Sequence, residues 1–291
     1  MVEWFIAVSP AERAGGELSP QSLRQAELAF QKYGCALLRG VFEASTLDAM
    51  HADYVARYAA MDSTRMQAEA ERPPPTPYIR VGDARYDITL RMNGAFGRPE
   101  VFANRLLCGL LATLLGDDMN MSSLTLVVSH PGAAMQHGHR DFPHLFADPG
   151  IGPGLPPYAI NVAVPLIDVD HETGPTGVWL GSHRWQSHIP NEQQKLTVCS
   201  FERGDCLLLD YRTVHAGMPN RTARARPIVY MVYARRWFAD FRNHAARASL
   251  DITPEEWQAL PESARALLLR AFFQPVQRPE PLTPSQATER T

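Results

Sequence analysis

The sequence lacks several features that mark whole classes of proteins. Its 28 basic and 31 acidic residues give a net charge of -3, so it has no basic excess of the kind that binding to nucleic acid or to an anionic membrane requires. It has no apolar run of the roughly 18 residues that a transmembrane helix needs, and its first residues include an acidic one but no basic cluster. We therefore expect a cytoplasmic protein that binds neither nucleic acid nor membrane.

Cysteine is scarce and common catalytic motifs are missing. The four cysteines, Cys35, Cys108, Cys199 and Cys206, have no C-x-x-C spacing and have hydrophobic neighbours, so we expect buried reduced thiols. The sequence contains no G-x-S-x-G, P-loop or G-x-G-x-x-G motif. It therefore gives no indication of a serine hydrolase, a P-loop nucleotide hydrolase or a dinucleotide-dependent enzyme.

What the sequence does contain is a His-x-Asp pair followed by a distant histidine. The apolar, β-branched run 124–129 leads to His139 and Asp141, which point to the same side if the segment is extended. A second predicted strand, 207–211, is followed by His215. Two histidines and one carboxylate form a facial triad, which suits divalent iron and leaves coordination positions open. Taken alone, a His-x-Asp pair is more often a hydrogen-bonded structural pair.

Further motifs surround this pair. They are His139-Arg140-Asp141, 172–184, Gly204-Asp205, 210–217, Asn220-Arg221-Thr222 and Arg226-Pro227, with the early strand-like segment 33–41. In order and spacing they resemble the phytanoyl-CoA dioxygenase-like branch of the iron(II)/2-oxoglutarate-dependent oxygenases. The resemblance extends over residues from about 20 to 240.

The resemblance implies a mainly β fold with flanking helices, built on a double-stranded β-helix, the jelly-roll or cupin-like arrangement of two facing antiparallel sheets. At 291 residues and 45% hydrophobic, the chain is long enough for a single catalytic domain spanning residues 1–291. We expect outer helices at about 19–60, the β-helix core at about 79–238, C-terminal helices at about 239–274 and a disordered tail at 275–291.

Local signals place some of these elements. Ser19-Pro20 predicts a helix start and Gly34 its end, while a second helix is expected after Ser45. The run 160–169 reads as a strand through the barrel. Thr253 begins a capping box, and a further helix is expected from Pro261 to Phe273.

The resemblance also implies the cofactors: Fe(II), 2-oxoglutarate as co-substrate, and O2. His139, Asp141 and His215 would hold the iron, and Arg226 would bind the distal carboxylate of 2-oxoglutarate. A guanidinium suits this role because its planar fork pairs bidentately with a carboxylate and keeps its charge when desolvated. Arg221 and Arg224 are nearby competitors that we interpret as turn residues.

One position departs from the family pattern. Some relatives carry a hydroxyl residue two places after the distal histidine, where this chain has Gly217. A contact from Thr222, Asn161 or a residue of an early strand would have to compensate. The presence of Asp141 argues against halogenation, since related iron halogenases have a small residue at that position.

The substrate pocket is predicted less sharply. The proline-rich segment 142–158 is either a lid over the iron or a surface loop with buried anchors. We expect His137 to line the pocket or to contact a metal ligand without binding the metal itself. Trp179 is either a stacking residue or part of the sheet core, and Arg80 or Arg91 is a substrate anchor or an exposed strand residue. The candidate pocket residues are His137, Phe142, His144, Phe146, Tyr158, Arg80, Arg91 and Trp179.

The function that the resemblance implies is hydroxylation of an unactivated C–H bond of a small-molecule substrate, a specialised metabolite or amino-acid derivative, with succinate and CO2 as co-products. The same iron site could instead catalyse desaturation, cyclisation or epimerisation. A hypothesis of another class is a β-helix protein that binds metal without redox turnover. Arg226 speaks against that hypothesis, because such a protein has no use for an arginine at the co-substrate position.

Overall fold

The strands of the described chain form two sheets. The computed structural model describes residues 3–146, 148, 150–187, 189–198, 200–244 and 247–272. The strands are β1 (Phe5–Ala7), β2 (Cys35–Arg39), β3 (Tyr78–Gly82), β4 (Arg85–Thr89), β5 (Asn120–Ser129), β6 (Ala159–Pro165), β7 (Thr176–Val178), β8 (Thr197–Val198), β9 (Cys206–Asp210), β10 (His215–Gly217) and β11 (Arg226–Ala234). A large sheet has the order β1-β2-β9-β6-β11-β5-β4-β3, and a small one the order β10-β7-β8. Neighbouring strands run antiparallel apart from β1 and β2.

The centre of the large sheet alternates between a core face and an open face. On β5, Leu124, Leu126 and Val128 are fully buried in the hydrophobic core. The intervening Ser123 and Thr125 point to the opposite face, because successive side chains of a strand alternate between faces. β11 lies between β5 and β6 and pairs with both. This open face, opposite the helices, is where the candidate site lies.

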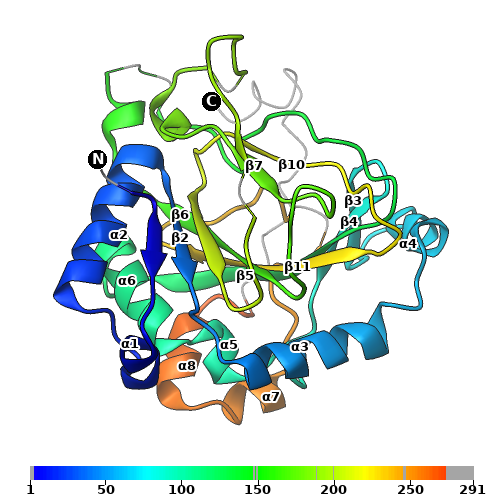
Figure 1. Cartoon of the computed structure of the whole chain (residues 1–291). Coiled ribbons are helices and arrows are strands. Elements are labelled where there is room, and N and C mark those ends of the chain that lie inside the picture. Colours follow the sequence, from blue (N-terminus) through cyan, green and yellow to red (C-terminus); the bar gives the residue numbers. More distant parts are fainter. Residues whose placement is uncertain are drawn as a thin grey trace, which may run out of the picture.

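Helices cover the core face. They are α1 (Pro10–Gly15), α2 (Pro20–Tyr33), α3 (Ala44–Arg57), α4 (Ser63–Ala70), α5 (Pro99–Phe102), α6 (Arg105–Leu115), α7 (Pro254–Gln258) and α8 (Glu262–Leu267), with 3-10 turns at Gly152–Gly154 and Ser182–Arg184. In Figure 1, α1, α3, α5, α7 and α8 lie at the bottom of the view, while β7 and β10 lie toward the top. None of the described helices is long and apolar enough to cross a membrane.

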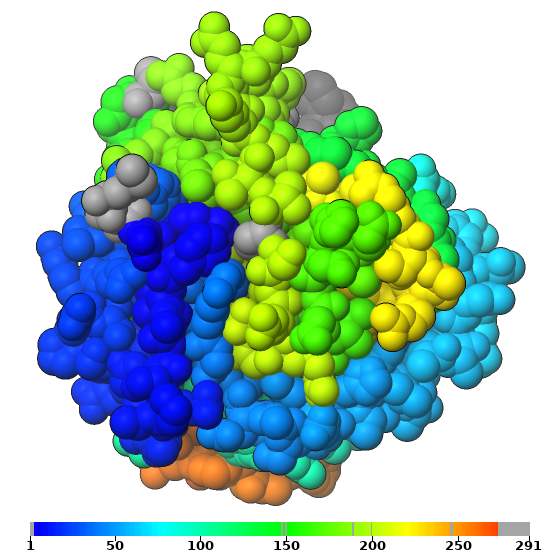
Figure 2. All heavy atoms as spheres, viewed as in Figure 1, coloured from blue at the N-terminus to red at the C-terminus, as the bar shows by residue number. Residues whose placement is uncertain are grey.

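The N-terminal segment extends the large sheet. β2 pairs with β9, so residues near the start of the chain lie beside residues some 170 positions later, from Cys35 opposite Leu209 to Leu38 opposite Cys206. Figure 2 shows the same contact from outside, with the blue N-terminal segment against the yellow-green one. The early strand predicted at 33–41 is therefore an inner strand of the sheet.

The predicted fold class is confirmed, with differences in detail. α2 has Ser19 as N-cap and Gly34 as C-cap, as expected. Helices α4, α5 and α6 were not predicted from the sequence, and the apolar α6 interrupts the expected β core. β6 ends at Pro165 rather than 169, since proline cannot continue a strand ladder. α8 ends at Leu267 rather than 273. The predicted tail lies outside the described residues.

The expectation for the thiols holds in part. Cys35 and Cys206 are buried, but Cys108 on α6 is only partly buried. Burial raises the pKa of the Cys108 thiol to about 11. Cys199 lies outside the described residues.

Candidate active site

The structure brings the predicted triad together. His139 and Asp141 lie in the segment after β5, and His215 is the first residue of β10. Backbone hydrogen bonds link the two histidines in both directions, with N–O distances of 2.9 and 3.0 Å. One ligand atom from each of His139, Asp141 and His215 lies within 4.8 Å of the others. The two histidines and the carboxylate therefore converge on one point, the geometry that a three-ligand metal site needs.

Backbone carbonyls orient both imidazoles. His139 Nδ1 lies 2.9 Å from the carbonyl oxygen of His137, and His215 Nδ1 lies 3.0 Å from that of Thr213. Because a carbonyl can only accept a hydrogen bond, each Nδ1 must carry the proton, which leaves each Nε2 free to bind a metal. His215 Nε2 lies 3.6 Å from Asp141 Oδ1. The free imidazole nitrogens thus face the carboxylate.

Two asparagines hold the carboxylate ligand. Asn161 on β6 donates from Nδ2 to Asp141 Oδ2 at 3.1 Å, which leaves Oδ1 on the histidine side. Asn243 donates to the Asp141 backbone oxygen at 3.0 Å. Burial and the neighbouring His215 lower the pKa of His139 and favour its neutral form, the form that binds metal. The donor set fits divalent iron, with neutral nitrogen and carboxylate oxygen ligands on one side of the ion.

A pair of buried arginines lies beside the triad. Arg85 on β4 and Arg226 on β11 stand opposite the same residue, Ser129 of β5, in the strand register. Arg85 Nε donates to Ser129 Oγ at 2.7 Å, and Arg226 Nη2 donates to the same oxygen. Both residues are at most 2% exposed, and within the described chain neither forms an ion pair with a carboxylate. Arg226 Nε has no hydrogen-bond partner there.

Burial destabilises the charged form of both guanidinium groups. Burial and the charge of Arg226 lower the pKa of Arg85 to about 10. Burial likewise lowers the pKa of Arg226. Two desolvated positive groups with only a shared hydroxyl between them form a site that an external anion would complete.

Gly217 is explained by the same arginine. A Cβ atom at residue 217 would lie 2.6 Å from Gln136 Oε1 and 2.7 Å from Arg85 Nη1. Gln136 Oε1 accepts from the Gly217 backbone N at 3.0 Å, and Arg85 Nη2 donates to the oxygen of Met218 at 2.8 Å. The space that a hydroxyl side chain fills in some relatives is therefore filled by Arg85 and Gln136.

The residues expected to compensate for Gly217 have other partners. The Thr222 hydroxyl donates to Asn220 Oδ1 at 2.8 Å, within its own turn. Asn161 contacts Asp141 instead, as described above. An early-strand residue was one of the predicted alternatives, but the sequence does not identify Arg85 or Gln136, since only strand pairing shows that β4 lies next to β5.

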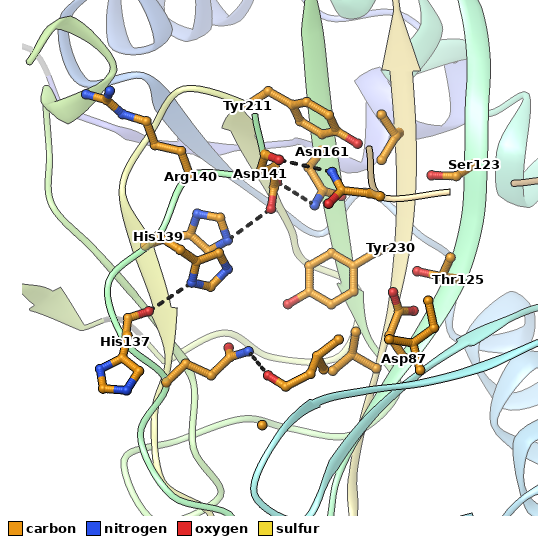
Figure 3. A pocket seen from close by; sticks show the side chains of 18 of the residues that line it. Asp87, Ser123, Thr125, His137, His139, Arg140, Asp141, Asn161, Tyr211 and Tyr230 are labelled. Atoms are coloured by element: carbon orange, nitrogen blue, oxygen red, sulfur yellow. Dashed lines mark hydrogen bonds and ion pairs between the residues drawn. The ribbon is translucent and has the colours of Figure 1, made fainter. Parts of the chain in front are cut away.

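A cavity of about 610 Å³ opens beside the triad. Figure 3 shows Asp141, Asn161 and Tyr211 along one side of it and Asp87, Ser123 and Thr125 along another. Its walls come from residues of β3, β4, β5, β6 and β11 and are closed by residues of the segment 134–141 and by Asn243, His244 and Arg247. The volume is typical of a small-molecule site. Of the predicted pocket residues, His137 lines this cavity, and so does Asn161, which was predicted as a co-substrate contact.

The aromatic candidates of segment 142–158 lie outside the cavity lining. Phe142 and Tyr158 pack edge to face, and both contact Phe238. His144 Nε2 lies 3.0 Å from the backbone oxygen of Trp185, and Phe146 is exposed. Phe142, His144 and Tyr158 thus contact the rest of the protein whereas the side chain of Phe146 is exposed, as in the interpretation of a surface loop with buried anchors.

The remaining candidates also lie elsewhere. Arg80 is exposed and pairs with Asp83, and Arg91 forms ion pairs with Asp251 and Glu256 at 2.6 and 3.0 Å. Trp179 is buried, its ring approaches Gly138, and its Nε1 donates to the Gln194 oxygen at 3.2 Å. Instead, the cavity is closed by Asn243, His244 and Arg247, which the sequence analysis did not single out.

Comparison with protein families and curated proteins gives one consistent answer. The phytanoyl-CoA dioxygenase (PhyH) family matches residues 30–228. The dioxygenase aneA of Aspergillus aculeatus is 33% identical over 119 residues, which cover 40% of each chain. The iron/alpha-ketoglutarate-dependent dioxygenase ausU of Aspergillus calidoustus is 35% identical over 96 residues, 32% of this chain and 31% of that protein. The matched segments thus span well under half of these curated relatives.

Solved structures share the fold. The epimerase SnoN, in complex with Fe3+, alpha ketoglutarate and nogalamycin RO, aligns with a TM-score of 0.56 and 19% identity over 75% of this chain and 85% of that one. HygX from Streptomyces hygroscopicus, with nickel, 2-oxoglutarate and hygromycin B bound, aligns with a TM-score of 0.53 and 15% identity over 77% of this chain and 90% of that one. The predicted cofactor pair of iron and 2-oxoglutarate is confirmed for the relatives that name their cofactors.

Proposed function

The chain belongs to the phytanoyl-CoA dioxygenase (PhyH) family, and from that premise we propose that it is an iron(II)/2-oxoglutarate-dependent dioxygenase that hydroxylates a C–H bond of a small-molecule metabolite. Succinate and CO2 are the co-products. The observation that carries the proposal is one site combining the three-ligand group with two buried arginines that lack an internal carboxylate.

Iron would be held by the two imidazole Nε2 atoms and by Asp141. The backbone carbonyls of His137 and Thr213 keep each imidazole in the tautomer that presents Nε2. Asn161 fixes the carboxylate from its far oxygen. When bound, iron and 2-oxoglutarate supply the activation of dioxygen, and the protein supplies geometry and exclusion of water.

Arg226 would bind the distal carboxylate of 2-oxoglutarate together with Arg85. The shared Ser129 hydroxyl holds both guanidinium groups at one level of the sheet. Two buried cations favour a ligand with a second carboxylate over a monocarboxylic keto acid, because only the former brings a negative charge to them. Gln136 and Gly217 support this arrangement by fixing the position of Arg85.

Desaturation, cyclisation and epimerisation are alternative outcomes of the same site. One observation supports epimerisation as the second candidate: the structurally similar SnoN is an epimerase. These outcomes differ in how the substrate is held within an ångström or so of the oxidant. We place hydroxylation first because it needs no further group from the protein after the C–H bond is broken.

The first experiment is anaerobic titration of the protein with iron(II) and 2-oxoglutarate, followed through the visible charge-transfer band of the chelate. We expect a band in the parent protein, none in His215→Ala, and an unchanged band in Thr222→Val, a hydroxyl outside the cavity. Succinate release against a metabolite panel then tests turnover. If bound metal gave no band with 2-oxoglutarate, the protein would instead be a metal-binding β-helix protein without redox turnover.

A further inference from the structure

A second polar cluster lines the cavity, away from the metal ligands. It consists of Asp87 on β4 with His244 and Arg247 from the segment after β11. Arg247 Nη2 donates to Asp87 Oδ2, and Nη1 donates to the Asp87 backbone oxygen at 3.1 Å. His244 and Arg247 are each 8% exposed. The cluster is therefore a built part of the fold rather than a chance group of surface charges.

Each member of this cluster has one polar atom without a partner. Asp87 Oδ1, Arg247 Nε and His244 Nδ1 are buried and form no hydrogen bond within the described chain. Orphaned buried polar atoms are rare, because each costs the free energy of its lost hydration. Three of them in one cavity wall indicate a ligand that supplies the missing hydrogen bonds.

Two hydroxyls extend this wall. Ser123 and Thr125 of β5 line the same cavity and are 3% and 6% exposed. Figure 3 shows both side chains on the wall that also carries Asp87. Because both residues line the cavity, their hydroxyls are placed to bind a ligand there.

The net charge of the cluster is zero. The Asp87 carboxylate and the Arg247 guanidinium compensate each other, so neither has a charge left to pair with an ion. Burial, reinforced by Arg247, lowers the pKa of His244, so the imidazole is neutral. Asp240 adds no free acceptor toward a cation, since Asn243 and the backbone of Arg242 donate to it. A charged ligand group would lose its hydration here without gaining a counter-ion.

The polar groups without a partner include both hydrogen-bond donors and acceptors. Asp87 Oδ1 can only accept, Arg247 Nε can only donate, and a serine or threonine hydroxyl can do either. A ligand hydroxyl can donate to the first and accept from the second. A carboxylate can only accept and an ammonium can only donate, so neither satisfies the set.

We propose that the substrate is a neutral, hydroxyl-bearing small molecule whose hydroxyl groups bind Asp87, His244 and the β5 hydroxyls while its reacting carbon faces the triad. This inference rests on the proposed function. Asn243 joins the two parts, since it precedes His244 and donates to the Asp141 backbone at 3.0 Å. His244 and Arg247 lie beyond residue 228, where the family match ends, so this specificity is set by a segment outside the matched core.

Fragment binding tests the proposal without turnover. Three probes on one scaffold, trans-cyclohexane-1,2-diol, cyclohexanecarboxylate and cyclohexylammonium, are titrated over immobilised protein under nitrogen, loaded with iron(II) and 2-oxoglutarate, by surface plasmon resonance. We expect the diol to bind about tenfold more tightly than either ion, in line with a difference of one or two hydrogen bonds. Equal or tighter binding of either ion, or no binding of the diol, would overturn the proposal.

Variants locate the binding. His244→Leu removes an orphaned nitrogen, and the nearly isosteric Thr125→Val removes one hydroxyl with little risk to folding. Each should weaken diol binding about fivefold, the effect of one lost hydrogen bond. His171→Leu, an exposed histidine outside the cavity, is the matched control and should bind as the parent does. Unchanged diol binding in both cavity variants would contradict the proposal that the substrate hydroxyls bind at this cluster. The charge-transfer band of the iron and 2-oxoglutarate chelate is measured separately, and its absence would contradict the proposed function rather than the substrate assignment.

Discussion

Two groups of buried arginine in this protein differ in whether they pair with a carboxylate of the same chain. Arg212 on one side, and Arg85 with Arg226 on the other, are all at most 2% exposed. Arg212 donates from Nε and Nη2 to the two oxygens of Asp210, at 2.8 and 2.6 Å. Arg85 and Arg226 both donate to the hydroxyl of Ser129, and within the described chain neither pairs with a carboxylate.

The difference separates a structural role from a binding role. The charge of Arg212 is neutralised inside the fold, and its Nη1 donates to the Leu155 oxygen at 2.7 Å, so the pair anchors the segment before β6. Arg85 and Arg226 keep uncompensated charges that an external carboxylate can neutralise. Burial of an arginine therefore does not by itself indicate a binding site, whereas burial without an internal carboxylate is the observation on which the proposed binding role rests.

Breaking the paired site should give the largest effect. Asp210→Asn leaves the buried Arg212 cation unpaired, and we expect the free energy of unfolding to fall by about 3–5 kcal/mol. Urea denaturation followed by circular dichroism measures it. The double variant Asp210→Asn/Arg212→Met, which removes both charges, should recover much of the loss. A single variant as stable as the parent would contradict the structural role.

The surroundings of the paired site also predict a pH effect. Burial lowers the pKa of His183 to about 4, from an ordinary value of 6.5. The unfolded chain therefore binds a proton that the folded one resists. The stabilisation is complete above about pH 6.5 and is lost as the pH falls toward 4, by up to about 3 kcal/mol. Urea denaturation between pH 4.5 and 7.5 should show a flatter profile in His183→Gln than in the parent or in His171→Gln, a change at an exposed histidine.

Removing a charge from the unpaired site should act on binding instead of stability. We expect Arg226→Met to weaken 2-oxoglutarate binding about 100-fold, as for one partner of a buried charge pair, without lowering the stability of the ligand-free protein. Calorimetric titration and urea denaturation give the two quantities. Arg226→Lys should restore only part of the affinity, because lysine lacks the bidentate fork. A large loss of stability in Arg226→Met would make this arginine structural.

The smallest expected effect comes from a single methyl group. Gly217→Ala places a Cβ against Gln136 Oε1 and Arg85 Nη1, which are the ends of flexible side chains and can move. We expect 2-oxoglutarate affinity to fall about tenfold through displacement of Arg85, with little change in stability. Iron affinity, measured without 2-oxoglutarate, should stay unchanged. An unchanged co-substrate affinity would show that Arg85 takes no part in binding.

Some features followed from local sequence. The caps Ser19 and Gly34 define α2, because they satisfy the helix's own terminal groups without help from distant residues. The His-x-Asp spacing predicted that His139 and Asp141 would face one point, since residues two apart share a side in extended chain. The fold class followed from motifs distributed along the chain in a fixed order.

Other features depended on contacts between distant segments. Arg85 looks like any strand arginine in the sequence, and only the pairing of β4 and β11 with Ser129 sets it beside Arg226. Arg80 and Arg91, the arginines singled out instead, find carboxylate partners on the surface. Their local patterns are alike, so the sequence offered no means of ranking the three.

The sequence by itself determined the candidate metal-binding triad, the family and the helix boundaries with strong caps, because these depend on residue type and short spacing. Tertiary structure decided which arginines face an internal carboxylate and which residues close the cavity. His244 and Arg247 reach the cavity wall from beyond β11, some 160 residues from Asp87. Such proximity follows from strand pairing and burial over long sequence separations, which local patterns do not encode.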